Sequence, residues 1–163
     1  MSEENEQVVR RGIDELWNGG RTEIIPEIPG PGYVRHDPAL PHSTNGPREL
    51  EQSVHLYRNA FPDLNLEIIE MHSTGDVVVV RWRATGTHRG DLMGIAPTGK
   101  RVEVTGLNLH RFSGGKMTDE IAEWDQVEML RNLGVLPGRD STQEKALRTV
   151  SNLRTKVTGA LGR

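Results

Sequence analysis

A few ionisable residues in the second half of the chain could carry out general acid–base catalysis. Asp125 follows Glu123 closely in the sequence EWD, and His110 lies a short distance before them. A carboxyl group with a pKa near neutrality can remove a proton beside a carbonyl and later return one to oxygen. Repulsion from Glu123 would raise the pKa of Asp125 toward that range, unless Glu123 instead forms a salt bridge with an arginine such as Arg81 or Arg83. These residues therefore predict proton-transfer chemistry, provided that the fold places them in a partly desolvated pocket.

Residues 101–125 predict a β-hairpin that would position these groups. Polarity alternates along residues 101–112 with the period of a strand, and Gly114-Gly115 tolerates the positive φ angles of a type I′ turn. Counting outward from the turn pairs His110 with Asp119. One face would then mix polar and apolar side chains, which is typical of a pocket wall. The residues expected on this face are Val102, Val104, Asn108, His110, Phe112, Met117, Asp119, Ile121, Glu123 and Asp125.

Asp125 and His110 each have a second, purely structural interpretation. The sequence from Asp125 to Glu128 has the form of a capping box, so Asp125 could simply begin a helix, and the two roles need not exclude each other. On the counted register, six residues of strand separate His110 from the level of Asp125, which is roughly 20 Å. His110 is then either a ligand contact far from Asp125 or a satisfied core histidine.

The remaining segments predict an α+β fold. Helical spacing of apolar residues precedes a run of alternating strands, and PGPG at residues 29–32 should interrupt the pattern between them. Such an order is typical of helices that cover one face of a mainly antiparallel sheet. The expected helices span residues 6–18, 21–28, 48–60, 126–133 and 142–161, and the expected strands span residues 33–37, 64–73, 76–88, 100–112 and 116–125.

The C-terminal segment differs in charge from the rest of the chain. Residues 139–163 hold six Arg or Lys against Asp140 and Glu144, a net charge of +4, so a total of −3 leaves −7 for the remainder. A basic helix on an acidic body could pack against its own domain or against a partner subunit. We therefore divide the chain into a domain of residues 1–137 and a basic helical extension of residues 138–163.

Composition excludes several classes of protein. The absence of cysteine excludes disulfides and thiolate zinc sites and favours a reducing cytoplasm, and the six histidines lack the spacing of a metal site. The acidic N-terminus and the lack of an apolar run of about 20 residues predict no membrane span. A net charge of −3 gives no general attraction to nucleic acid.

Three stretches resemble the SnoaL-like polyketide cyclases and the related ester cyclase proteins. They are FPDLNLEI, VVVRWRATGTHRGDLMGIAPTGKRVEVTG, and the segment from RFSGGK to EWDQVEMLRNLG, and the resemblance covers roughly residues 8–136. It implies a cone-shaped fold of the nuclear-transport-factor-like superfamily. In that fold a strongly curved, mainly antiparallel sheet packs on N-terminal helices around a pocket. The basic tail after Gly138 departs from the family pattern and would add a C-terminal helix.

The resemblance also implies a reaction and a set of site residues. Family cyclases close the last ring of aromatic polyketides by an intramolecular aldol step, without metal or cofactor, using an aspartate on the last strand. That aspartate matches Asp125, and the family's pocket histidines match His36 and His110. We therefore expect Asp125, His110 and His36 to be catalytic, and the ligand to be a hydrophobic polycyclic molecule. The expected substrate-binding residues are Tyr57, Trp82, His88, Asn108, Phe112, Ile121 and Glu123.

Three functions stay open on the sequence. The first is a cyclase or isomerase, the second a cofactor-independent hydroxylase or epoxide hydrolase on the same fold, and the third a non-catalytic small-molecule-binding or dimerisation module. A desolvated Asp125 in a cavity would favour an enzyme. Strands 77–88 and 100–111 carry apolar residues on both faces, and one helix layer covers only one face. A homodimer is therefore predicted, because Leu107, Leu109 and Trp124 on the uncovered face need a partner subunit or the C-terminal helix to cover them.

Overall fold

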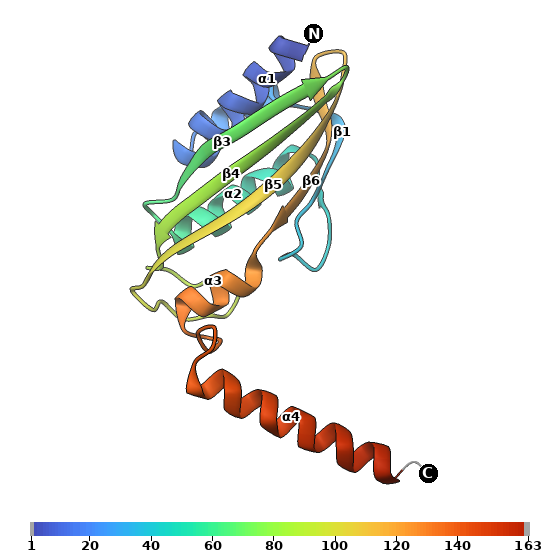
Figure 1. The fold of residues 1–163 in the computed structure, drawn as a ribbon. Coiled ribbons are helices and arrows are strands. Elements are labelled where there is room, and N and C mark those ends of the chain that lie inside the picture. The colour runs from blue at the N-terminus through green and yellow to red at the C-terminus, as the bar shows by residue number, and fades with distance from the viewer. Residues whose placement is uncertain (1, 162–163) are drawn as a thin grey trace.

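A strongly curved sheet dominates the computed structural model, which describes the backbone of residues 2–161 and the side chains of residues 3–151. The described residues form six strands in the order β2-β1-β6-β5-β4-β3, with β1 parallel to β6 and every other neighbouring pair antiparallel. The predicted α+β class is therefore confirmed (Figure 1). The strands are β1 (Pro29–His36), β2 (Thr44–Asn45), β3 (Asn65–Thr74), β4 (Val77–Thr87), β5 (Arg101–Ser113) and β6 (Lys116–Trp124).

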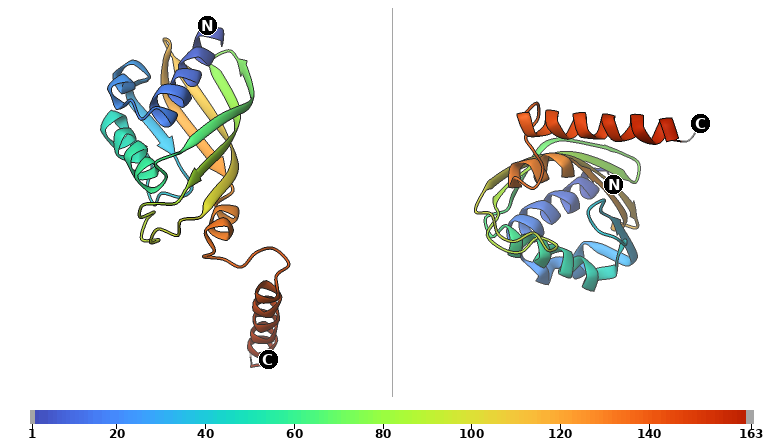
Figure 2. Two further views of the ribbon diagram at one scale, coloured as in Figure 1. Left: turned by 90° about the vertical axis from the view of Figure 1, so that its left-hand side faces the viewer. Right: turned by 90° about the horizontal axis from the view of Figure 1, so that it is seen from below.

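Helices cover the concave face of this sheet. The α-helix α1 (Ser2–Arg11) continues into the π-helix η1 (Gly12–Asn18), and the 3₁₀ helix η2 (Thr22–Glu27) leads to β1. Helix α2 (Gly46–Ala60) lies beside them, while α3 (Gln126–Leu133) follows β6 at one end of the sheet. Figure 2 shows these elements enclosing the interior, whereas α4 (Thr142–Leu161) extends away from it. None of the described helices is long and apolar enough to cross a membrane.

The core follows from the alternation along each strand. In β4, Val78 and Val80 are fully buried against the helices, and in β5 the side chains of Val102 and Val104 face the same way. Apolar residues of the helices pack on this inner face, including Leu50 and Val54 of α2. These side chains lie on the inner face of the curve, and none of the helices in the described residues lies over the opposite face (Figure 1).

The β5–β6 hairpin contains a bulge that the sequence did not predict. Its turn is as expected, because Ser113 pairs with Lys116 and Phe112 pairs with Met117. The next pair, however, joins Arg111 to Asp119, so Thr118 is left without a partner in the ladder. The predicted pairing of His110 with Asp119 is therefore wrong.

This bulge reverses the face of every residue that follows it in β6. Side chains alternate along a strand, so a shift of one residue moves each of them to the opposite side. His110 now pairs with Glu120 and Gly106 pairs with Trp124. The residues that turn inward are Glu120, Ala122 and Trp124, and those that turn outward are Asp119, Ile121 and Glu123.

The strand before α2 also differs from the prediction. PGPG does not interrupt the fold but forms the start of β1, where the pairing with β6 is irregular between Pro29 and Val34. Proline lacks the N–H that a regular ladder needs, and Gly32 supplies a left-handed φ of 83°, so the irregularity accommodates both residue types. The expected loop before α2 contains the short strand β2. The hairpin of β3 with β4 and the helices α3 and α4 are confirmed.

Candidate active site

A cavity of about 110 Å³ lies between the concave face of the sheet and helices α1, η1, α2 and α3. A single water needs roughly 10–15 Å³ of such space, so the cavity suits a larger molecule. Its lining is mostly apolar, and it includes every tryptophan and every tyrosine of the chain. The aromatic lining residues are Trp17, Tyr33, Tyr57, Phe61, Trp82 and Trp124.

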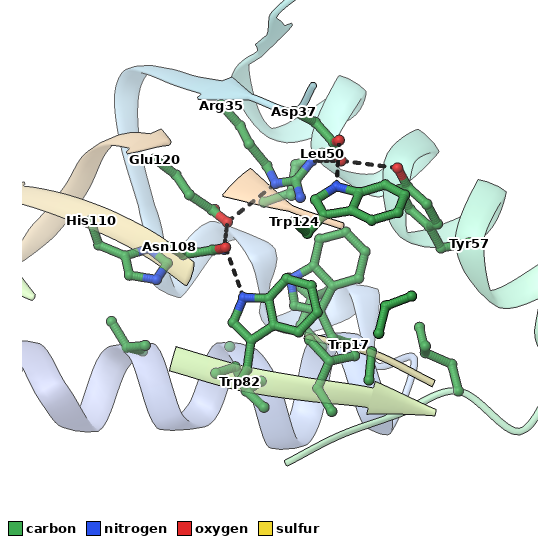
Figure 3. Close-up of a pocket in the computed structure, with 18 of the residues that line it drawn as sticks. Trp17, Arg35, Asp37, Leu50, Tyr57, Trp82, Asn108, His110, Glu120 and Trp124 are labelled. Carbon is green, nitrogen blue, oxygen red and sulfur yellow. Dashed lines mark hydrogen bonds and ion pairs between the residues drawn. The ribbon is translucent and has the colours of Figure 1, made fainter. Parts of the chain in front are cut away.

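Arg35 stands at the centre of the polar wall and bridges two carboxylates (Figure 3). Its Nε donates to Oε1 of Glu120 at 3.2 Å, and its Nη1 donates to Oδ2 of Asp37 at 2.8 Å. All three side chains are buried. Burial disfavours the ionised forms of both acids, but the charge of Arg35 and the hydrogen bonds to each carboxylate bring both pKa values below their ordinary range.

Asp37 is fully occupied as an acceptor. Its Oδ1 accepts from the backbone N–H of Ala39 at 3.0 Å and from Nε1 of Trp124 at 3.1 Å. Its Oδ2 accepts from Tyr57 Oη at 3.0 Å as well as from Arg35. A carboxylate offers about four acceptor positions, so Asp37 is suited to anchoring the wall rather than to contacting a ligand.

Glu120 accepts three hydrogen bonds within the same network. Tyr33 Oη donates to Oε2 at 2.6 Å, and Nδ2 of Asn108 joins Arg35 as a donor to Oε1, also at 2.6 Å. Asn108 in turn accepts from Nε1 of Trp82 at 2.8 Å. One acceptor position on Oε2 stays open. The carboxylate is ionised, because each of its three partners donates a hydrogen bond to it and so favours the charged form.

His110 differs from all these residues, because neither of its ring nitrogens has a hydrogen-bond partner among the described residues. It is buried, it lines the cavity, and it lies beside Asn108 and Glu120 (Figure 3). Burial lowers the pKa of His110, the negative charge of Glu120 opposes this, and Arg35 adds to the lowering. The ring is therefore neutral near pH 7. Since buried polar groups are almost always paired, its missing partner points to a ligand in the cavity.

Four of the predicted site residues lie where they were expected. Tyr57, Trp82, Asn108 and His110 all line the cavity. They come from α2, β4 and β5, which confirms that the hairpin forms a pocket wall.

Asp125 lies outside the cavity, at the start of α3, and its expected position on the pocket wall is wrong. Its Oδ1 accepts from the backbone N–H of Glu128 at 2.8 Å, so the predicted cap is confirmed. The side chain is 45% exposed, and its Oδ2 lies 3.8 Å from Nη2 of Arg139. Strand β6 ends at Trp124, so the residue that follows leaves the alternation of the sheet.

His36 and Glu123 also lie away from the cavity. Both border a separate open depression on the outer side, together with the loop of residues 37–43. The side chain of His36 is 49% exposed, and its Nδ1 lies 2.9 Å from Ser43 Oγ. Their predicted position on the cavity wall is therefore wrong, because His36 ends β1 with its side chain outward and the bulge at Thr118 turns Glu123 outward.

The other three residues predicted to contact the substrate, Phe112, Ile121 and His88, lie outside the cavity. Ile121 turns outward because of the bulge, and Phe112 packs in the core beside the hairpin turn. His88 is fully buried, with Nδ1 accepting from the backbone N–H of Thr98 at 3.2 Å, and it supports the loop after β4. None of the three is among the residues that line the cavity.

The hydrogen-bonded network of the wall contains five residues that sequence reasoning missed. Tyr33, Arg35 and Asp37 alternate in YVRHD, and this period could have placed them on one strand face. The sequence could not place Glu120 and Trp124 on this face. Both follow the bulge at Thr118, and the pattern of polar and apolar residues before a bulge does not indicate it. Within the part of the chain that the structure describes, no three His, Asp or Glu side chains are placed to hold a metal ion.

Comparison with known proteins finds a family whose members match most of the chain. The family model of SnoaL-like polyketide cyclases matches residues 7–133. Aklanonic acid methyl ester cyclase DnrD of Streptomyces peucetius is 31% identical over 134 residues, covering 78% of this chain and 88% of that protein. Nogalonic acid methyl ester cyclase of Streptomyces nogalater is 32% identical over 122 residues, covering 72% and 89%.

Solved structures share the fold at lower identity. A candidate SnoaL-like polyketide cyclase from Jannaschia sp. CCS1 has a TM-score of 0.75 at 24% identity and covers 83% of this chain and 95% of its own. TsrD from Streptomyces laurentii has a TM-score of 0.73 at 22% identity, covering 82% and 97%. These similarities concern the fold alone.

Proposed function

The chain belongs to the SnoaL-like polyketide cyclase family, and from this premise we propose that it closes a ring of an aromatic polyketide-like carbonyl compound. The reaction class is an intramolecular aldol addition. Two named relatives, the cyclases of aklanonic and nogalonic acid methyl esters, support a substrate of this kind. The single observation that carries the mechanism is the neutral, unpaired His110 beside the ionised Glu120 in an aromatic cavity.

His110 is the proposed general base and acid. Its neutral ring removes a proton from the carbon between or beside carbonyl groups, and the C–H electron pair forms an enolate. The enolate carbon attacks the second carbonyl, which forms the new C–C bond and leaves an alkoxide. His110 then returns its proton to that oxygen. Atoms and electrons balance within the substrate and one histidine, so the reaction consumes no co-reactant.

Glu120 supports this cycle without acting as the base. Its pKa is lowered and three donors already occupy it, so it is a poor proton acceptor. Its negative charge lies opposite His110 across the hairpin and stabilises the imidazolium that forms after proton removal. Arg35 and Asp37 hold this carboxylate in place through the buried ion pairs.

The aromatic lining supports a planar, polycyclic substrate. Six of the seven aromatic residues of the chain line the cavity, and indole and phenol rings bind flat apolar molecules through stacking and edge contacts. Because all three tryptophans are among them, ligand binding should change the intrinsic tryptophan fluorescence.

The test is incubation with aklanonic acid methyl ester or an analogue with an uncyclised side chain, followed by chromatography and mass spectrometry. A product isomeric with the substrate, or lighter by one water, supports the aldol reaction. A product heavier by one oxygen would indicate hydroxylation. A separate incubation with an epoxide that gives a product heavier by one water would indicate epoxide hydrolysis. Binding without turnover would indicate a binding module. In the cyclase, His110→Gln should lower the rate by about a hundredfold to ten-thousandfold, the usual range for a general acid–base residue.

A further inference from the structure

We propose that Trp82 and Asn108 form a positioning relay that holds Glu120 as a hydrogen-bond acceptor beside His110. The relay runs from Nε1 of Trp82 to Oδ1 of Asn108, at 2.8 Å, and from Nδ2 of Asn108 to Oε1 of Glu120, at 2.6 Å. Neither residue touches the reacting atoms in this scheme. The inference rests on the proposed function, because it assigns the two residues a role in the same site.

The donor at the start of the relay fixes its direction. An amide side chain can usually be turned over, because its oxygen and nitrogen ends have the same shape. The indole N–H of Trp82 can only donate, so the oxygen of Asn108 must face it. The amide nitrogen of Asn108 then faces Glu120 and can only donate as well. Oε1 of Glu120 is consequently an acceptor and carries no proton.

Gly106 gives the indole the space that this arrangement needs. Trp82 of β4 pairs directly with Gly106 of β5, so its ring lies over the glycine and reaches Asn108, two residues along the same strand. A Cβ at position 106 would lie 2.7 Å from Cη2 of Trp82 and 2.8 Å from the backbone oxygen of Glu123. Any larger residue would therefore displace the indole from Asn108 or distort the hairpin.

The relay has a chemical consequence for His110. Glu120 stabilises the imidazolium only while it is ionised and held at its position opposite His110. Two groups donate to Oε1 of Glu120: Nε of Arg35 at 3.2 Å and Nδ2 of Asn108 at 2.6 Å. The amide of Asn108 is therefore the closer donor at that oxygen. Loss of the relay removes one stabilising donor and raises the pKa of Glu120.

The test measures the pKa of the Glu120 carboxyl by carbon NMR in protein with labelled glutamate. Glu120 is the only buried glutamate within residues 3–151, and its signal is identified by its loss in Glu120→Gln. Trp82→Phe and Asn108→Leu should each raise this pKa. Each should also lower kcat about tenfold. Because Trp82 and Asn108 also line the cavity, a change in KM reports a lost substrate contact, whereas the pKa of Glu120 reports the relay. The double variant should resemble Asn108→Leu alone, because both changes break one relay.

Trp17→Phe is the matched control. Trp17 lines the same cavity but is not part of the relay. Its ring centroid lies 5.1 Å from Cζ of Arg35, and phenylalanine keeps an aromatic ring at this cation–π contact. Its replacement should leave the pKa of Glu120 unchanged, and its effect on kcat should add to that of Asn108→Leu. If Asn108→Leu fails to fold, Asn108→Asp preserves the shape and places a second carboxylate against Glu120. The two acids must then share a proton, which should raise the apparent pKa strongly.

Two results would overturn the relay. One is an unchanged pKa of Glu120 in Trp82→Phe and in both Asn108 variants, and the other is additive effects of Trp82→Phe and Asn108→Leu. Because the NMR measurement needs no turnover, a protein without cyclase activity could still show the relay. A failure of the proposed function is thus distinguishable from a failure of this inference.

Discussion

Glu120 lies directly opposite His110 across the β5–β6 hairpin because Thr118 is left out of the ladder between them and the turn. The bulge thereby brings a buried carboxylate to the one cavity histidine whose ring nitrogens are unpaired among the described residues. If Thr118 were paired in a regular ladder, the acid opposite His110 would be Asp119. That acid instead faces outward and pairs with Arg111 at 2.9 Å.

Deletion of Thr118 should preserve the site. Removal of the unpaired residue joins Met117 to Asp119 in a regular ladder, so Glu120 keeps its position opposite His110. We expect a folded variant with turnover within about tenfold of the original. Deletion of Ala122 is the control, because it should reverse the face of Trp124 and abolish activity. A Thr118 deletion that folds but binds no ligand would contradict the observed register.

The sequence allowed the elements to be predicted better than the site. Helix α3 was predictable because Asp125 caps its start and Gly134 ends it with a left-handed φ of 79°. The β5–β6 turn was predictable because paired glycines favour one turn type. Both signals are local, so no knowledge of distant contacts was needed.

The site depended on interactions that are not local. Strand β6 pairs with both β5 and β1, and nothing in the sequence around Thr118 indicates the bulge. The pairing of Arg35 with Glu120 joins residues far apart in the chain. Alternation along YVRHD could have placed Arg35 and Asp37 on one face, but PGPG before it suggested a break rather than a strand.

Asp125 should contribute to stability far more than to turnover. Its carboxylate caps α3 and is half exposed, outside the cavity. Asp125→Ala should cost about 1 kcal/mol of unfolding free energy, and Asp125→Asn less, because asparagine also caps helices well. Denaturant unfolding and steady-state kinetics measure the two effects. Loss of turnover in a stable Asp125→Asn variant would restore the catalytic role that the family resemblance implies.

His110 should make the folded state less stable in mild acid. Burial lowers its pKa below the ordinary value of 6.5, so the unfolded chain binds a proton more readily than the folded protein does. The stability that the neutral His110 contributes is complete above about pH 6.5. It is lost as the pH falls toward the lowered pKa of the folded state. The difference in unfolding free energy between about pH 7.5 and about pH 5.5 should therefore shrink in His110→Gln. An equal difference in both proteins would mean that folding does not lower the pKa of His110.

Removal of Arg35 should destabilise the protein strongly, because it leaves Asp37 and Glu120 buried without their cation. We expect Arg35→Met to cost about 3–5 kcal/mol in denaturant unfolding. Arg35→Met combined with Asp37→Asn and Glu120→Gln should recover part of the loss while turnover stays absent. Arg11→Met is the control, since its two ion pairs lie at the surface and should contribute nothing measurable. A stable single variant would show that water reaches these carboxylates.

The outer face of the sheet should form a homodimer interface. Val79, Leu109 and Ile121 lie side by side across three strands on this face, and Leu107 beside them is 44% exposed. Trp124, which was predicted on this face together with Leu107 and Leu109, faces the cavity instead because of the bulge. Within the described residues α4 leaves this face uncovered, since it extends away from the sheet and its Leu147 is 58% exposed (Figure 1). A second copy is the partner whose matching apolar face would cover it.

Light scattering at micromolar concentration should therefore give the mass of a dimer, both for the full chain and after deletion of residues 138–163. Leu107→Glu and Leu109→Glu should each shift the mass toward the monomer, because they place a charge in the covered apolar stripe. Val150→Glu, on the exposed part of α4, is the matched control and should leave the dimer intact. A monomer mass for the full chain would refute the interface. A dimer that is lost only with residues 138–163 would instead assign the contact to α4.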